Sequence, residues 1–176
     1  MSYSTRLLLG LTLLLPLITV PASAQKSPQP SDYERFITAI STGKIEAVQA
    51  EIDKGSDINA REKILGSRVI YNKVYGETPL MHAAARGSAT PIVELLLDNG
   101  AQVNAHDDSG VTALMEAAKF NWSWNVKLLL NRGAQVNARS NYGLTPLTIA
   151  ALPRYDHPVR ELAIVKLLLE GGAEVD

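Results

Sequence analysis

The side chains best suited to catalysis or metal binding in this chain are three histidines, His82, His106 and His157. Two histidines one helical turn apart can bind a metal ion, and a histidine beside a serine can activate a nucleophile. No two of these histidines are four residues apart, and none stands in a metal-ligand motif. The nearest approach to a ligand cluster is His106-Asp107-Asp108, a turn-like segment that serves either turn hydrogen bonding or a metal.

Other signatures of catalysis are also missing from the sequence. No glycine-rich phosphate loop precedes a helical segment, the serines lie in no nucleophile-elbow pattern, and the carboxylates are scattered. The chain has no cysteine, which excludes disulfides, thiol catalysis and cysteine-bound zinc or iron–sulfur centres. We therefore expect no enzyme, no cofactor and no metal site. A hydrolase or a small-ligand carrier is kept only as a third, less favoured class.

The composition indicates one small globular domain. The 176 residues match the size of a single domain, and the 46% that are hydrophobic are too many for a disordered chain. The 17 lysines and arginines nearly balance the 18 aspartates and glutamates. Because nucleic-acid binding needs a clustered basic excess, we expect no nucleic-acid partner.

Residues 1–24 have the pattern of a secretory signal peptide. Arg6 is followed by the apolar run 7–20, and Ala22-Ser23-Ala24 has the small residues that a signal peptidase accepts. A membrane anchor is the alternative, but a span needs about 20 apolar residues, and this run is shorter and contains Pro16. We expect cleavage after Ala24, no membrane association afterwards, and a periplasmic or secreted protein. The lack of cysteine favours the bacterial periplasm, since small secreted eukaryotic domains are usually rich in disulfides.

A flexible leader is expected over residues 25–30, where Pro28 and Pro30 exclude a helix. Ser31 and Glu34 then have the spacing of a capping box, in which each side chain binds the other residue's backbone N–H. The folded domain is therefore predicted to span residues 31–176.

A motif of about 33 residues recurs along this domain. Gly-x-Thr-x-Leu begins at Gly76, Gly110 and Gly143, at spacings of 34 and 33 residues. An alanine pair, a run of three leucines and a Gly-Ala step follow each time. The leucine runs are 95–97, 128–130 and 167–169, and the Gly-Ala steps begin at residues 100, 133 and 172. Such a period indicates a solenoid in which each unit packs against its neighbours.

These linked motifs resemble the ankyrin-repeat family, and the resemblance covers about residues 31–176. It implies an all-α solenoid of helix-turn-helix units with β-turns between them. The residue types fit such units. Thr78 and Thr145 can cap a helix, and the proline that follows each can take its first position. Glycine can end a helix in the left-handed conformation, and a leucine run needs a neighbour on each side to be buried.

We expect units over residues 31–60, 76–109, 110–142 and 143–176, with an insertion over 61–75. The first unit is degenerate: Ala50-Glu51-Ile52 replaces the leucines of its second helix, and this polarity suits a solvent-facing end. The last unit has no such polar face. Its helix pair is therefore expected to be covered, for which a homo-oligomer is one possibility.

Two insertions interrupt the repeat pattern. Within 61–75, the stretch from Ile64 to Tyr71 has a Gly-Ser turn between short β-prone runs, which predicts a β-hairpin finger. Residues 152–161 lengthen the link between the two helices of the last unit. Tolerated loop growth is one interpretation of both insertions, and contact with a partner is the other.

Several positions depart from the family pattern. The family's histidine after Thr-Pro-Leu is replaced by Met81, Met115 and Thr148, and His82, one residue later, is not assigned its role. Asn121 stands where a glycine normally separates the two helices. Asp107 matches the family's turn aspartate, so turn hydrogen bonding is favoured over a metal site. Of Trp122 and Trp124, which lie between helices, at least one is expected in the core.

In the family, partners bind the concave face formed by the turn tips and the first helices. The resemblance transfers that role to the matching positions here, and the insertion adds aromatic side chains. The predicted partner-binding residues are Tyr71, Val74, Tyr75, Glu77, Arg86, His106, Asp108, Ser109, Val111, Lys119, Phe120, Arg139, Asn141, Tyr142 and Leu144. Tyr75, Phe120 and Tyr142 are expected to form a stripe, because aromatic side chains provide much contact energy per ordered residue.

We interpret the chain as a non-catalytic protein that binds another protein in the periplasm. The resemblance implies an accessory role, because exported ankyrin proteins of bacteria often support or protect an enzyme in the same compartment. The alternative is an immunity or inhibitor protein that neutralises a periplasmic toxin or enzyme, with the finger inserted into an active site.

Overall fold

The computed structural model describes residues 30–61, 76–152 and 158–175. Within these ranges the chain forms eight α-helices and one 3₁₀ turn, Gly87–Ala89, and has no strand beyond an isolated bridge. The first helices of the units are α1 (Asp32–Ser41), α3 (Pro79–Ala84), α5 (Ala113–Lys119) and α7 (Pro146–Ala151). The second helices are α2 (Ile45–Asp53), α4 (Thr90–Asp98), α6 (Ser123–Asn131) and α8 (Pro158–Glu170).

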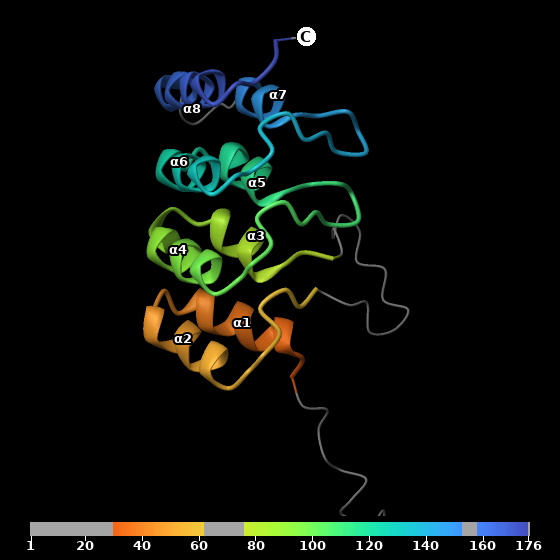
Figure 1. The fold of residues 1–176 in the computed structure, drawn as a ribbon. Helices are drawn as coiled ribbons and strands as arrows, with labels where there is room; N and C mark the ends of the chain where they lie inside the picture. Colours follow the sequence, from red (N-terminus) through yellow and green to blue (C-terminus); the bar gives the residue numbers. More distant parts are fainter. Residues whose placement is uncertain (1–29, 62–75, 153–157, 176) are drawn as a thin grey trace, which may run out of the picture.

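The helices form two layers. Figure 1 shows α1, α3, α5 and α7 stacked in one layer and α2, α4, α6 and α8 in the other, with the loops between units projecting from the first-helix layer. Each unit packs against the next within both layers. The predicted all-α repeat solenoid is therefore confirmed.

The capping residues set where each first helix begins. The Thr78 hydroxyl accepts from the Met81 N–H, and Thr145 forms a capping box with Thr148. Thr112 caps α5 in the same way, although alanine rather than proline follows it. At the start of the domain, the predicted capping box of Ser31 and Glu34 is confirmed. These side chains satisfy backbone N–H groups that have no partner inside the helix.

The leucine runs form the core between units. The middle leucines, Leu96, Leu129 and Leu168, are fully buried, and most of those beside them are half-buried against the same cluster. Leu169 is the exception at 43% exposed. Met81 and Met115, which replace the family's histidine, are also buried. The second helices α4 and α6 are thus enclosed by the units on both sides, whereas α8 presents part of its leucine run to solvent.

Asparagine side chains join successive units at the end of each second helix. The amide of Asn104 donates to the Gly133 carbonyl over 3.1 Å and accepts from the Gln135 N–H over 2.8 Å. Asn59 and Asn137 make the equivalent pairs of bonds to the next Gly-Ala step. Gly133 itself has φ +83°, as expected for the residue that ends a helix. Each unit therefore fixes where the following second helix stops.

The two insertions are only partly described. Residues 62–75, which include the predicted hairpin finger, lie outside the described residues. In the last unit, the expectation that 152–161 is entirely link is wrong, because α8 already begins at Pro158. Proline is well suited to that place, since the first residue of a helix has no hydrogen-bond partner for its N–H.

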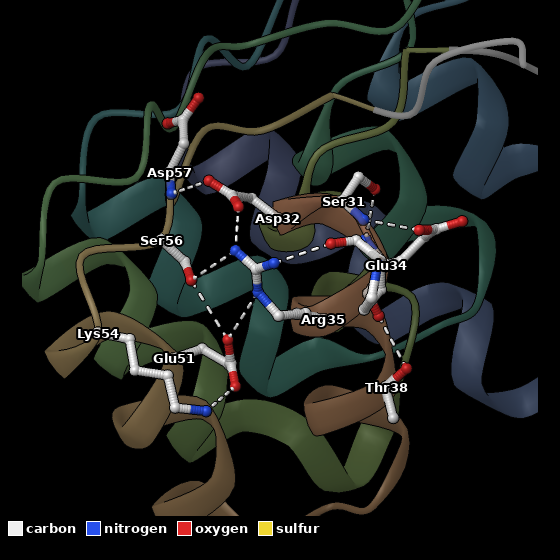
Figure 2. A network of polar contacts seen from close by, with 10 residues as sticks. Ser31, Asp32, Glu34, Arg35, Thr38, Glu51, Lys54, Ser56 and Asp57 are labelled. Carbon is white, nitrogen blue, oxygen red and sulfur yellow. Dashed lines mark hydrogen bonds and ion pairs between the residues drawn. The ribbon is translucent and has the colours of Figure 1, made fainter. Parts of the chain in front are cut away.

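A polar network closes the outer side of the first unit (Figure 2). Glu51 lies at its centre and is only 9% exposed, so it is not the solvent-facing residue that the sequence suggested. Its carboxylate accepts from Lys54 Nζ over 2.6 Å and pairs with Arg35 Nε over 3.2 Å. Arg35 also binds Asp32 and the Pro30 carbonyl, and Asp32 accepts from the Asp57 N–H. The terminal unit thus uses internal ion pairs where an interior unit has leucines.

The Glu51 network makes the first unit sensitive to acid. The hydrogen bond from Lys54 is the main cause that holds the pKa of Glu51 below its ordinary value, and burial opposes it. A lowered folded-state pKa stabilises the fold above the unfolded-state value, and this contribution is lost as the pH falls through the folded-state value. Glu51→Gln is therefore expected to lower stability by about 1–2 kcal/mol at neutral pH. It should also flatten the loss of stability between about pH 5 and pH 3.

Urea unfolding at a series of pH values, followed by circular dichroism, measures both effects. Glu46→Gln is the matched control, because Glu46 is an exposed glutamate on the same helix. The control should leave both the stability and its pH profile near those of the parent protein. An unchanged acid profile in Glu51→Gln would contradict this role for the carboxylate.

Candidate functional site

In the two fully described loops between units, one side chain accepts hydrogen bonds from the backbone of its own loop and so fixes the loop's conformation. The Asp107 carboxylate accepts from the N–H groups of Ser109 and Val111 over 2.8 and 2.9 Å. Ser140 holds the equivalent place in the next loop and accepts from the N–H groups of Tyr142 and Leu144. The prediction that Asp107 serves turn hydrogen bonding is therefore confirmed. Each loop ends in a turn, and the loops project outward from the first-helix layer (Figure 1).

Adjacent loop tips are bound to each other. The Asn141 N–H donates to the Ser109 carbonyl over 2.8 Å, and its side-chain amide donates to the Asp108 carbonyl over 3.0 Å. Asn141 and Ser109 were predicted to bind a partner. The structure shows that part of their polar capacity is already used to hold the two loops in register.

Arg61 holds the base of the insertion together. Its Nε donates to the Gly76 carbonyl over 3.1 Å, so the residues flanking 62–75 are in direct contact. Its Nη2 binds the His106 carbonyl and the Asp108 carboxylate, each over 3.0 Å. Gly76 has φ +85°, and a Cβ there would lie 2.5 Å from the Arg61 guanidinium. His106 and Asp108, both predicted site residues, therefore support the insertion's base as well as the loop surface.

The first helices and the loop tips together form what we call the inner face. A cavity of about 400 Å³ opens on it between α3 and α5. Four predicted partner-binding residues line this cavity, and four more residues that were not predicted join them. The predicted ones are Glu77, Arg86, Lys119 and Phe120, and the others are Met81, His82, Ala85 and Glu116.

The polar groups of the cavity are held by specific contacts. Arg86 Nη2 lies 3.0 Å from His82 Nε2 and 3.4 Å from the Ser41 hydroxyl. Lys119 Nζ lies 3.3 Å from a Glu116 carboxylate oxygen and 5.2 Å from the centre of the Phe120 ring. The Phe120 side chain is 40% exposed. The result is an apolar ring at the cavity's edge with cations beside it.

The cavity also contains residues that sequence reasoning missed. Glu116 and Lys119 are three residues apart and share a side of α5. Arg86 lies four residues after His82, just beyond the end of α3, and contacts its ring. Tyr33 of α1 reaches the same region and donates to a Glu77 carboxylate oxygen over 3.2 Å. Helical spacing from the predicted Arg86 and Lys119 was the signal that could have found His82 and Glu116.

The remaining predicted residues do not form the expected stripe. Tyr71, Val74 and Tyr75 lie outside the described residues. Tyr142 is 77% exposed at a loop tip, whereas Phe120 follows the far end of α5. The prediction that these aromatics line up is therefore wrong for Phe120 and Tyr142, because the length of a first helix separates their positions along the unit. Arg139 is exposed near that loop tip, and Val111 and Leu144 are half-buried beneath the loops.

The expectation that at least one of the two tryptophans lies in the core is wrong, because neither belongs to the buried cluster. Trp122 is half-buried and donates from Nε1 to the Ala85 carbonyl over 2.8 Å, so it belongs to the contact between the second and third units. Trp124 is 73% exposed and lines a second cavity of about 370 Å³ with Ala163 of α8. Neither tryptophan lines the cavity of the inner face.

The described ranges contain no group of three or more histidine, aspartate or glutamate side chains that could hold a metal ion. Within the same ranges, none of the helices has the length and hydrophobicity to cross a bilayer. None of the curated proteins matches the chain.

The family model described as ankyrin repeats, three copies, matches residues 36–140 and 106–176. These two overlapping matches cover nearly all of the part of the chain that forms the stacked helix pairs. Ankyrin repeats are generally protein–protein interaction modules and are typically non-enzymatic. Both the stacked units and this match lead to the same conclusion: the chain belongs to the ankyrin-repeat family.

Proposed function

We propose that this protein acts by binding a partner protein on its inner face, with the cavity between α3 and α5 at the centre of the contact. The observation that carries the proposal is the exposed ring of Phe120 beside Lys119 and Arg86. Aromatic and arginine side chains that line a pocket supply most of the binding energy in protein interfaces. These side chains lie at or just after the ends of α3 and α5, which are fixed by packing on both sides, so little ordering is needed on binding.

The proposal includes export and an accessory role. The signal-like pattern of residues 1–24 supports a periplasmic or secreted location, and the family's use in interactions supports a role in sustaining or protecting the partner. Cell fractionation is the direct check of location. Recovery of the uncleaved chain in the cytoplasm would contradict export.

The partner is best sought by crosslinking from the proposed site. A photoreactive benzoylphenylalanine replaces Phe120 in one variant and Lys127, an exposed residue of α6, in the control. Both are expressed in the native host. We expect a specific adduct from position 120 only. For the captured protein, Phe120→Ala should weaken binding at least about tenfold while the fold stays intact.

Equal crosslinking from positions 120 and 127, or unchanged binding by Phe120→Ala, would contradict the proposed surface. The partner's activity then distinguishes the roles. A partner that keeps or gains activity when saturated supports the accessory role, and a partner whose activity is abolished supports the immunity or inhibitor alternative.

Self-association through the last unit is a secondary part of the proposal. Leu162, Leu169 and Val175 are 74%, 43% and 80% exposed there, which supports a covered surface. A monomeric mass by light scattering at high protein concentration would contradict it.

A further inference from the structure

We propose that Arg86 is the receptor for a carboxylate of the partner, supplied by an aspartate or glutamate side chain that lies next to an apolar residue covering Phe120. This inference rests on the proposed function and names the chemistry that the inner-face cavity recognises.

The charge of Arg86 is not neutralised by the described part of the chain. Its Nη2 contacts a ring nitrogen of His82 and the hydroxyl of Ser41, neither of which carries a negative charge. Among the described residues, no carboxylate lies within ion-pair distance of the Arg86 guanidinium. By comparison, Arg132 on the outer layer pairs with both Glu94 and Asp98. Arg86 is thus a half-buried cation whose contacts position it without compensating its charge.

The donors left on Arg86 face solvent in the cavity. Its Nε and Nη1 have no acceptor among the described residues, whereas Nη2 has the two contacts above. Within the described ranges, every side-chain nitrogen or oxygen that is sealed from solvent has a hydrogen-bond partner. The Nε and Nη1 donors are therefore accessible, and Arg86 lines the cavity. Each of these charged donors can give a hydrogen bond to a carboxylate oxygen, and such charge-assisted bonds are stronger than those between neutral groups.

Two carboxylates line the same cavity, and their contacts explain why they do not neutralise Arg86. Glu116 is paired with Lys119, and Glu77 accepts from Tyr33. Each carboxylate therefore has a partner other than Arg86. A partner carboxylate at Arg86 would gain an ion pair in a partly enclosed site, where attraction between opposite charges is stronger than on an open surface.

Phe120 determines the second feature that the partner needs, an apolar side chain that covers its ring. Its ring is 40% exposed and lines the same cavity as Arg86. Burying that ring beneath an apolar side chain would exclude water from the neighbouring ion pair and strengthen it. The recognition element is therefore an acidic residue beside an apolar one in the same segment of the partner.

A phage-displayed library of random 12-residue peptides is the probe, selected on the purified protein. Peptides that bind the parent protein but not Phe120→Ala identify ligands of the inner-face cavity. We expect each of these to contain an aspartate or glutamate whose change to asparagine or glutamine weakens binding at least about tenfold. Arg86→Gln should cause a similar loss, and combining both changes should cause little further loss.

Two further variants keep the test specific. Lys127→Gln removes the same charge from the exposed surface of α6 and should leave peptide binding unchanged. Arg86→Lys keeps the charge but loses the fixed guanidinium donors and their contacts with His82 and Ser41, so it should recover only part of the affinity. Circular dichroism and urea unfolding of Arg86→Gln check that the fold is retained.

The outcomes separate this inference from the proposed function. Peptides that depend on Phe120 but not on an acidic residue or Arg86 would overturn the carboxylate inference and leave the inner face as the binding surface. A selection with no peptide sensitive to Phe120→Ala would count against the inner face itself and so against both. Equal losses from Arg86→Gln and Lys127→Gln would reduce the effect to net charge and overturn the specific role of Arg86.

Discussion

Replacing Asn125 with alanine is expected to lower the free energy of unfolding by about 3 kcal/mol, a large loss for a single polar side chain. Asn125 lies near the start of α6 and is fully buried. Its side-chain amide donates to the Ala84 and Arg86 carbonyls, each over 3.0 Å. Its side-chain oxygen accepts from the Thr90 hydroxyl over 2.6 Å. All of these side-chain hydrogen bonds therefore cross from the third unit to the second.

The size of the expected loss of stability follows from the backbone carbonyls that these hydrogen bonds satisfy. The last carbonyls of a helix have no partner within it, and those at the end of α3 are covered by the next unit. The Asn125 amide donates to the Ala84 and Arg86 carbonyls, and Trp122 Nε1 donates to the Ala85 carbonyl between them. Alanine at position 125 would leave the buried Ala84 carbonyl and the half-buried Thr90 hydroxyl without these partners, while the Arg86 carbonyl keeps only its bond from the Ala89 N–H. Each buried polar group that loses its partner costs about 1–3 kcal/mol.

Urea unfolding followed by circular dichroism measures the loss. Asn131→Ala is the matched control, because it is the same change at the exposed end of the same helix. The control should change the stability by less than about 0.5 kcal/mol. Since the lost bonds join two units, the transition of Asn125→Ala should also broaden as the halves of the solenoid unfold less cooperatively. Similar losses from the two variants would contradict the role of Asn125 as the link between units.

The sequence was sufficient to predict features that repeat. The caps at Thr78 and Thr145, the buried leucine runs and the glycines that end the second helices recur in register, so each copy supports the interpretation of the others. Asn125 was not predicted, because it occurs in one unit only and its partners lie 39 and 41 residues earlier in the chain. A lone polar residue on an amphipathic helix is usually solvent-exposed, and only the packing of the two units shows that this one is not.

The sequence predicted only part of the candidate site, because it does not show which side chains meet across units. Arg86 and Phe120 follow the ends of their first helices at corresponding places, Lys119 is the last residue of α5, and the structure brings all of them to one cavity. The contacts that make the cavity specific were out of reach from the sequence. Whether Arg86 meets a carboxylate or a neutral group depends on side-chain placement across units, as the contacts with Ser41 and His82 show.

The second unit has one residue more than the third, and the two units differ in backbone conformation just after their first helices. Gly43 and Asn121, which end the first helices of their units, have φ of +68° and +63°. Gly87 occupies the corresponding place, but it lies in the 3₁₀ turn and does not have a positive φ. Its lack of a side chain serves a different purpose: a Cβ on Gly87 would lie 2.2 Å from the Trp122 ring.

Gly87→Ala is therefore expected to displace the Trp122 indole and break its hydrogen bond to the Ala85 carbonyl, at a cost of about 2–3 kcal/mol. The fluorescence of Trp122 reports the displacement. With Trp124 changed to phenylalanine, Trp122 is the remaining tryptophan, and its emission should shift to longer wavelength as the ring becomes exposed. Ser88→Ala, in the same turn but exposed, is the control and should change neither stability nor emission.

A double-mutant cycle separates the clash from any effect on the backbone. In a Trp122→Ala background the ring is absent, so adding Gly87→Ala should cost less than about 0.5 kcal/mol. The small cost is expected because Gly87 does not need the left-handed conformation that favours glycine at Gly43. An equal loss in both backgrounds would show that the backbone of the 3₁₀ turn, rather than the Trp122 ring, requires glycine at position 87.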